Sequence, residues 1–217
     1  MLVEERRQKL RDLISTYGFA SLQDLARKID VSESTIRRDL EHLHQMGYLR
    51  RTHGGAVWNQ DGAPLPPLED RSCRQLEEKR WIGELASGLI QDGDTVLLDG
   101  GTTTLEVARD LLGSGKRVQV LTNSLPIAHM FASNPGSDLV VLGGYVYPRT
   151  GVALGSSTIR MLEDLHAHVA ILSVGGITEQ GLFNSNLLLV ETERAMMSRA
   201  ERVIVVADHT KVGRRAL

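Results

Sequence analysis

The sequence has almost no cysteine and no long apolar run. Cys73 is the single cysteine among 217 residues, which excludes an internal disulfide and fits a reducing compartment. No apolar stretch approaches the roughly 20 residues that a membrane-spanning helix needs. The first ten residues, MLVEERRQKL, are charged and lack the apolar segment of an export signal. These absences predict a cytoplasmic protein.

The chain also lacks an overall basic charge. Its 25 Lys and Arg residues face 27 Asp and Glu residues, so the net charge is −2, which argues against a protein that coats nucleic acid. Residues 1–57 hold ten basic and eight acidic side chains, a net of +2, and the remainder carries −4. This asymmetry is too small to indicate a DNA partner by itself.

Two nucleotide-binding signatures are missing as well. The G-x-G-x-x-G fingerprint of dinucleotide-binding folds is absent. The segment GSGK at 113–116 resembles part of a P-loop, but Asp110 replaces the first glycine and Arg117 replaces Ser or Thr. No carboxylate or cysteine completes a metal site with His166 and His168. We therefore expect no cofactor and no metal.

A proline-rich segment divides the chain. Pro64, Pro66 and Pro67 lie within WNQDGAPLPPLEDR, and proline disfavours helix and favours an extended, stiff connection. We predict an N-terminal domain at 1–57, a linker at 58–73 and a larger domain at 74–217.

Helical spacing dominates residues 1–57. Ser21 with Asp24, and Ser32, are predicted to cap the second and third helices, and Gly18 and Gly47 to end the first and third. Apolar side chains recur every three or four residues at Leu10, Leu13, Ile14, Leu22, Leu25, Ala26, Ile29, Ile36, Leu40 and Leu43.

The third helix carries hydroxyls and guanidiniums on the side away from its apolar stripe. Ser34 and Arg38 lie opposite the stripe, with Thr35 and Arg37 on its flanks. Such groups at the first turn can bond to base edges and phosphates in a DNA major groove. The segment GYLRRTHGGA then alternates around Gly54-Gly55, which predicts a β-hairpin wing.

Three helices and a wing predict a winged helix-turn-helix that binds operator DNA. The alternative, a surface helix whose arginines are merely solvated, is disfavoured by the capped helix before it and the wing after it. The residues expected to contact DNA are Ser32, Ser34, Thr35, Arg37, Arg38, Arg50, Arg51 and His53.

Residues 6–57 resemble the N-terminal domain of the DeoR family of bacterial transcriptional regulators. The matching segments are RRQKLRDLI and DLARKIDVSESTIRRDLEHLHQMGYLRRTHGGA. The resemblance implies a DNA-binding transcriptional regulator, and we expect a repressor.

Short apolar strands alternate with helices after the linker. This pattern is typical of a mainly parallel sheet covered by helices on both faces. The fold class is therefore α/β, an N-terminal winged helix-turn-helix followed by a mainly parallel, doubly covered sheet. Strands are predicted at 95–99, 117–122, 138–144, 169–176 and 202–208, and helices at 74–91, 156–166, 187–200, near 102 and after 123.

The loop from Asp99 to Thr104 is the candidate ligand site. Its free N–H groups and the dipole of the following helix favour an anion, and ligands of parallel sheets bind beyond the carboxyl ends of the strands. A phosphorylated small molecule is therefore predicted. The loop could instead be a structural turn, and the sequence leaves both interpretations open. The effector-binding candidates are Asp99, Gly100, Gly101, Thr102, Thr103, Thr104, Asn123, Gly143, Gly144, Gly175, Gly176, Glu191 and Lys211.

The segments LLDGGTTT, VLTNS, VLGG, SVGGI and ADHTKVGRRAL resemble the DeoR effector domain, which is similar to ribose-5-phosphate isomerase. The resemblance implies that sugar phosphates act as inducers. It maps the pocket onto Asp99, Gly101, Thr102, Thr103, Asn123, Glu191 and Lys211. Many members have a lysine two residues after the position of Glu191, where this chain has Glu193.

These patterns favour a repressor of a sugar-metabolism operon that a phosphorylated sugar releases from DNA. A homo-oligomer, a dimer or larger, would place two recognition helices about one DNA turn apart. The alternative is a sugar-phosphate isomerase with an appended DNA-binding module. In that enzyme Asp99, Glu191 and Lys211 would supply the base and stabilise the enediolate.

Overall fold

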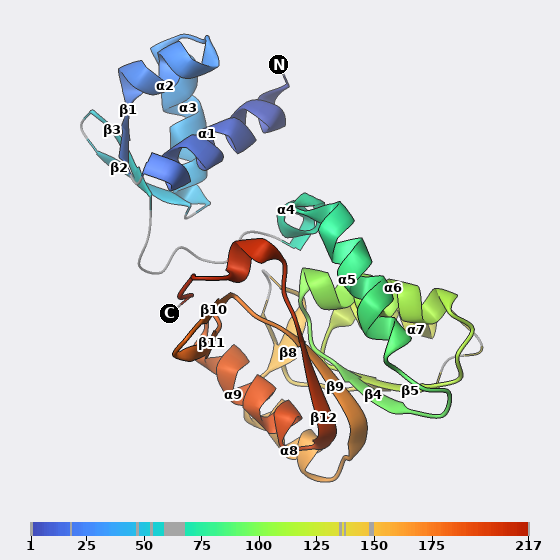
Figure 1. Ribbon diagram of the computed structural model, residues 1–217. Helices are drawn as coiled ribbons and strands as arrows, with labels where there is room; N and C mark the ends of the chain where they lie inside the picture. Colours follow the sequence, from blue (N-terminus) through green and yellow to red (C-terminus); the bar gives the residue numbers. More distant parts are fainter. Residues whose placement is uncertain are drawn as a thin grey trace. The chain divides into compact units, whose positions relative to one another are not determined.

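The computed structural model describes residues 2–17, 19–46, 48–52, 54–58, 68–134, 136, 138–147 and 150–216. The chain forms two compact units, Met1–Pro64 and Leu65–Leu217 (Figure 1). No helix in the described ranges is both long enough and apolar enough to cross a membrane.

The first unit contains three helices, α1 (Val3–Tyr17), α2 (Leu22–Ile29) and α3 (Glu33–Gln45), and three strands, β1 (Phe19–Ser21), β2 (Leu49–Thr52) and β3 (Gly55–Trp58). The strands form one antiparallel sheet in the order β1-β3-β2. The apolar stripes of all three helices meet in a single core that includes Leu10, Leu25 and Ile36. This is the predicted winged helix-turn-helix.

Two predicted helix caps are present in this unit. The Oγ of Ser21 accepts a hydrogen bond from the N–H of Asp24 at 3.1 Å, and the Oγ of Ser32 accepts one from the N–H of Thr35 at 3.3 Å. Each bond satisfies a donor that a helix start leaves open. The predicted helix ends at Gly18 and Gly47 lie outside the described residues.

The wing is the hairpin of β2 and β3. Of the glycine pair Gly54-Gly55, only Gly54 lies outside the strands. Thr52 pairs with Gly55, so Gly55 belongs to β3. The strand β1 pairs with the other edge of β3. A Cβ at Gly55 would lie 2.1 Å from the carbonyl oxygen of Ala20, so this position requires glycine because β1 comes so close. β1 has three residues, too few for an alternating pattern to predict it.

The second unit is built on a five-stranded parallel sheet. Its strands are β4 (Thr95–Leu98), β5 (Gln119–Thr122), β6 (Asp138–Val141), β9 (Ala167–Ser173) and β12 (Ala200–Val206), in the order β12-β9-β4-β5-β6. All neighbours in this sheet pair in parallel. Two small antiparallel pairs were not predicted: β7 (Tyr145–Tyr147) with β8 (Val152–Leu154), and β10 (Gly176–Thr178) with β11 (Gly181–Phe183).

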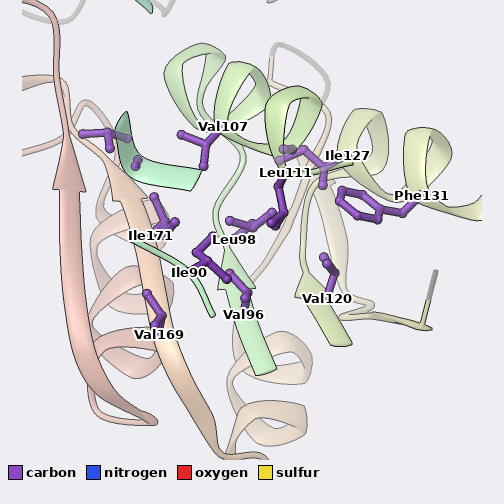
Figure 2. Close-up of a cluster of buried hydrophobic side chains, with 13 residues drawn as sticks. Ile90, Val96, Leu98, Val107, Leu111, Val120, Ile127, Phe131, Val169 and Ile171 are labelled. Atoms are coloured by element: carbon purple, nitrogen blue, oxygen red, sulfur yellow. The ribbon is translucent and has the colours of Figure 1, made fainter. Parts of the chain in front are cut away.

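Helices cover both faces of this sheet. On one face α5 (Leu76–Gly88), α6 (Thr102–Gly113) and α7 (Leu125–Ala132) pack on a core in which Val96, Leu98 and Val120 point from the strands toward the helices (Figure 2). On the other face, α8 (Ser156–Glu163) and α9 (Leu187–Met197) pack on the alternate strand residues Leu97 and Leu121. Successive strand residues face opposite sides, so the sheet is buried on both, as predicted.

The prediction that residues 58–71 contain no helix was wrong for their last part, because α4 spans Leu68–Cys73. A proline breaks a helix that contains it, but not one that begins after it, and Pro67 precedes α4 in the sequence. Glu69 and Asp70 also favour a helix start. α4 belongs to the second unit and packs against α6.

Candidate DNA-binding helix and ligand site

The exposed side of α3 carries the predicted DNA-binding side chains. Ser34, Arg37 and Arg38 are exposed and Thr35 is half-buried, whereas the apolar stripe is fully buried. Neither Arg37 nor Arg38 makes a hydrogen bond or ion pair with the described part of the chain. The Oγ of Ser32 lies 2.9 Å from the hydroxyls of both Ser34 and Thr35. The first turn of α3 therefore presents a hydroxyl cluster beside two available guanidiniums.

A buried acid on the inner side of α3 is neutralised by two arginines of α1. Asp39 accepts hydrogen bonds from the Nε of Arg6 at 2.6 Å and from the Nε of Arg7 at 3.1 Å. The bond to Asp39 raises the pKa of Arg6 against the opposing effect of burial. These contacts fix α3 on α1. Sequence reasoning missed them, although Asp39 follows Ile36 by three residues and so lies on the buried side.

Of the wing residues predicted to contact DNA, only Arg51 has a described side chain. Arg51 is exposed and forms an ion pair with Glu41 of α3. The side chain of Arg50 and the whole of His53 lie outside the described residues. Arg51 therefore contacts α3 through one of its nitrogens, and its other N–H donors can reach a phosphate.

In the second unit, polar residues gather at the carboxyl edge of the sheet. Asp99 follows β4, Asn123 follows β5, Ser173 ends β9, and Asp208 stands two residues beyond β12. The carboxyl ends of parallel strands meet at one edge, which is where such sheets bind ligands. The short helix η1 (His209–Lys211) begins at Asp208, so Lys211 comes to this edge as predicted.

Asp99 organises this edge. Its carboxylate accepts hydrogen bonds from the N–H of Gly101 at 3.1 Å, the Oγ1 of Thr104 at 2.6 Å, and the N–H and Oγ of Ser173 at 2.6 and 3.1 Å. Burial raises the pKa of Asp99, and these bonds act in the opposite direction. With four donors around it, Asp99 holds the ends of β4 and β9 and the start of α6 together.

The glycines and threonines of the loop have different roles. A Cβ at Gly100 would lie 1.6 Å from Cγ1 of Val152, and one at Gly101 would lie 1.8 Å from the Oγ of Ser173, so both glycines are required by packing. Thr102 and Thr103 are buried as residues, and their hydroxyls make no hydrogen bond with the described residues. The first N–H groups of α6 also have no acceptor within the helix. The start of α6 is therefore open to an anion.

Five basic side chains surround this edge, and sequence reasoning identified one of them. Burial lowers the pKa of Lys211; Asp208 acts against this, and the neighbouring guanidiniums lower it further. Lys79 has the same environment, and its Nζ donates to the carbonyl oxygen of Arg71 at 2.6 Å. Like charges therefore lie close together around Asp208, the acid that acts on both lysines. We name this set the cation cluster; it consists of Arg71, Arg74, Lys79, Lys211 and Arg214.

The contacts of the cation cluster leave a donor available to an anion. The Nζ of Lys211 lies 3.9 Å from Oδ2 of Asp208, the one acid that the two lysines share. The Nε of Arg74 is buried without a hydrogen-bond partner in the described structure. Arg71 is also close enough to Asp99 for the two charges to interact. The cluster and the start of α6 therefore belong to the same edge.

Other predicted effector residues are placed differently. Glu191 is exposed on α9, while Glu193 of the same helix is half-buried. The carbonyl oxygen of Gly143 accepts from Thr158 of α8, and a Cβ on Gly144 would collide with the same hydroxyl. Gly175 and Gly176 pack closely against residues 214–216, with a Cβ on Gly176 falling 2.0 Å from the carbonyl oxygen of Arg214. These glycines serve packing in the structure.

A winged DNA-binding unit joined to an α/β unit with a charged ligand edge defines a ligand-responsive transcriptional regulator. The family described as "DeoR-like helix-turn-helix domain" matches residues 6–61, and that described as "DeoR C terminal sensor domain" matches residues 74–217. The chain belongs to the DeoR family of transcriptional regulators.

Curated relatives match along almost the whole chain. The HTH-type transcriptional regulator GolR of Listeria innocua is 32% identical over 210 residues, covering 96% of this chain and 82% of the relative. The glycerol-3-phosphate regulon repressor of Escherichia coli is 31% identical over 214 residues, covering 98% and 84%. The chain is a regulator, and the isomerase alternative was wrong.

Among solved structures, ribose 5 phosphate isomerase A from Neisseria gonorrhoeae overlaps the chain with a TM-score of 0.49. The two are 18% identical, and the overlap covers 64% of this chain and 54% of the isomerase. The fold class rests on the strand order and on the family rather than on this overlap.

Proposed function

We propose that this regulator represses a sugar-metabolism operon and leaves its operator when a phosphorylated sugar binds the second unit. The cation cluster beside the start of α6 is the observation that carries this proposal. A phosphate is a small anion with several acceptor oxygens. It would relieve the repulsion around Lys211 and accept hydrogen bonds from the first turn of the helix.

The edge also offers groups for the sugar itself. Thr102, Thr103 and Asn123 are buried residues near Asp99, and the hydroxyl or amide of each can bond to a sugar hydroxyl or phosphate oxygen. The name of the Escherichia coli relative, a glycerol-3-phosphate regulon repressor, supports an effector of the phosphate-ester class.

We further propose that α3 reads the operator. Ser34, Arg37 and Arg38 are exposed on the side away from the core. A guanidinium can bond to guanine O6 and N7 or to a phosphate, and a hydroxyl can bond to either. Arg51 of the wing is the candidate for a backbone contact beside its pair with Glu41.

A homo-oligomer is the third part of the proposal. The helix α5 exposes a stripe of Trp81 at 70% and Leu85 at 73%, with Leu89 at its end, and large apolar side chains in a row favour a protein partner. Arg80 and Glu84 precede Trp81 and Leu85 by one residue each. Two antiparallel copies of α5 could therefore pair these opposite charges while the apolar stripes pack. The oligomeric state, measured by sedimentation in solution, tests this part.

Fluorescence anisotropy with a labelled operator, selected from genomic DNA with the purified protein, tests the other two parts. The wild type should release the operator on addition of a phosphorylated sugar but not of the unphosphorylated sugar. Arg38→Ala should weaken operator binding by about 1–3 kcal/mol, roughly tenfold to hundredfold, and relax specificity at one base pair.

Arg160→Ala is the matched control for Arg38→Ala, because Arg160 is exposed on α8 of the second unit. It should leave operator affinity unchanged. Operator release by none of the phosphorylated sugars would refute the effector assignment, and full operator affinity in Arg38→Ala would refute the recognition helix.

A further inference from the structure

A second acid lies close to Asp99. Glu193 of α9 is half-buried, and its Oε1 accepts a hydrogen bond from the Nδ2 of Asn184 at 2.6 Å. Burial, and then the charge of Asp99, raise the pKa of Glu193 to about 9. At neutral pH the carboxyl group of Glu193 is therefore protonated and uncharged, and it carries its proton in a confined polar site.

Asp99 does not stabilise the proton of Glu193 by a hydrogen bond, because its own carboxylate already accepts from four donors. The carboxyl group of Asp99 is held in place by the turn and by β9, so it stays within electrostatic range of Glu193. A ligand group that brings positive charge favours the ionised forms of both acids, and it would allow Glu193 to ionise.

A buried acceptor without a partner in the described structure lies alongside Asp99. Asn123 is 3% exposed, and its Nδ2 donates to the carbonyl oxygen of Ala153 at 2.9 Å. Because a carbonyl can only accept, the amide orientation is fixed, and Oδ1 is left without a donor among the described residues. Leu98 pairs with Thr122, so Asn123 stands alongside Asp99 at the strand ends. The Oγ of Ser185, next to Asn184, is also buried without a partner.

The acid pair and the cation cluster face one ligand edge. Asp99 interacts electrostatically both with Glu193 and with Arg71 of the cluster. The edge is therefore basic on the side of α4 and η1 and acidic on the side of α9. An effector that matches both sides carries a negative group at one end and a donor, best a positive one, at the other.

We propose that Glu193 makes the sensor selective for a phosphorylated sugar that bears a protonated amine, with its phosphate on the cation cluster and its ammonium group on Glu193. This inference rests on the proposed function, since it names the class of sugar that the same site takes. An ammonium group has three donors and no acceptor, which suits Glu193, the Oδ1 of Asn123 and the Oγ of Ser185. A hydroxyl in its place brings no charge.

The proton balance of binding follows from this arrangement. The amine arrives protonated and Glu193 begins protonated, so forming the ammonium–carboxylate pair releases the Glu193 proton to solvent. Binding of the amino sugar phosphate should therefore release about one proton more than binding of its hydroxyl counterpart, because the phosphate contributes equally in both.

Isothermal titration calorimetry on the full chain tests the proposal with matched ligands. The probes are hexose 6-phosphates, their 2-amino-2-deoxy counterparts, and the N-acetylated forms, in which the amine is neutral. At pH 6.5, where the amine is protonated, the amino form should bind about tenfold to hundredfold more tightly than the other two. Repeating the titration in buffers of different ionisation heat measures the released proton.

Variants of Glu193 assign the preference to this residue. In Glu193→Gln the ratio of amino to hydroxyl affinity should fall to within about threefold of one, and in Glu193→Lys it should invert, because like charges repel. Glu163→Gln removes an exposed carboxylate from the end of α8 and should keep the wild-type ratio. Should a variant fail to fold, the wild-type affinity ratio and proton release still decide the matter.

The failures are distinguishable. If phosphorylated sugars bind and release the operator with no preference for the amine and no extra proton, the selectivity of Glu193 is refuted and the proposed function stands. A preference that survives in Glu193→Gln also refutes it. If no sugar phosphate binds at all, both proposals fall.

Discussion

The two units of this chain use arginine and lysine in opposite ways. In the DNA-binding unit, Arg6 and Arg7 both bond to the buried carboxylate of Asp39. In the sensor unit, the basic side chains of the cation cluster crowd around Asp208, and the pKa values of Lys79 and Lys211 are lowered. The first arrangement has matched charge, because Arg7 also pairs with Glu4, and it contributes to folding. The second gathers several positive charges around one shared acid, which costs stability and which a bound anion would relieve.

The comparison offers a physical criterion for a ligand site. A buried charge with bonded partners at close range is part of the scaffold, as Asp39 and Asp99 both are. Buried groups that all carry the same charge do not stabilise the fold in this way. The same holds for buried polar atoms without partners in the described structure, such as the Nε of Arg74. Such groups are a more specific criterion for a ligand site than the glycine-rich loop is, because Gly100 and Gly101 are explained by packing alone.

The largest expected effect comes from breaking the matched set. Asp39→Ala should destabilise the DNA-binding unit by about 3–5 kcal/mol, because two partly buried guanidiniums lose their carboxylate. Urea unfolding followed by circular dichroism measures the change, and operator binding should be lost with it. Glu33→Gln removes an exposed acid from the first turn of the same helix and should cost about 1 kcal/mol or less. Equal costs for the two variants would contradict the scaffold role of Asp39.

Two adjacent threonines separate scaffold from ligand contact in the sensor unit. Thr104→Ala deletes the 2.6 Å bond to Asp99 and should destabilise this unit by about 1–3 kcal/mol, since a buried carboxylate loses a donor. Thr103→Ala should change stability little but reduce the affinity for a phosphorylated sugar about tenfold to hundredfold.

Urea unfolding and inducer-dependent operator release, measured on both threonine variants, make the distinction. In cells, Thr103→Ala should give constant repression despite inducer. A Thr103→Ala protein that is less stable and yet normally inducible would show that the loop is purely structural.

The smallest stability change is expected for a member of the cation cluster. Lys211→Gln should alter the unfolding free energy of the ligand-free protein by about 1 kcal/mol or less, and toward greater stability, because repulsion is relieved. The same variant should lose about tenfold to hundredfold in affinity for a sugar phosphate. Arg160→Gln, an exposed change on α8, should affect neither quantity. Marked destabilisation by Lys211→Gln would show that Lys211 stabilises the fold. It would contradict the claim that the two units use their basic side chains differently.

Much of the fold could be predicted because its signals are local. The caps at Ser21 and Ser32 and the apolar strands of the parallel sheet each depend on residues a few positions apart. The four strands of the small pairs, and β1, have three residues each, too short for alternation to stand out. They form because a neighbouring segment offers backbone partners.

The ligand edge could be predicted only in part, because charge convergence is not local. Arg71 and Arg214 come from opposite ends of the sensor unit, and nothing in their sequence neighbourhoods connects them. The choice between Glu191 and Glu193 shows the same limit. Side chains two residues apart on a helix point about 200° away from each other. Only the packing of α9 therefore decides which of the two carboxylates is buried.

α4 also determines where this protein can be cut and rejoined. Arg71 lies on α4 and Arg74 directly follows it, so this short helix belongs with the sensor in any hybrid regulator. A biosensor that fuses a foreign DNA-binding module to this sensor should place its junction within residues 59–67. The match to the sensor family begins at residue 74, but a junction after Cys73 would remove Arg71 from the sensor. The resulting hybrid should bind its promoter but respond poorly to its inducer.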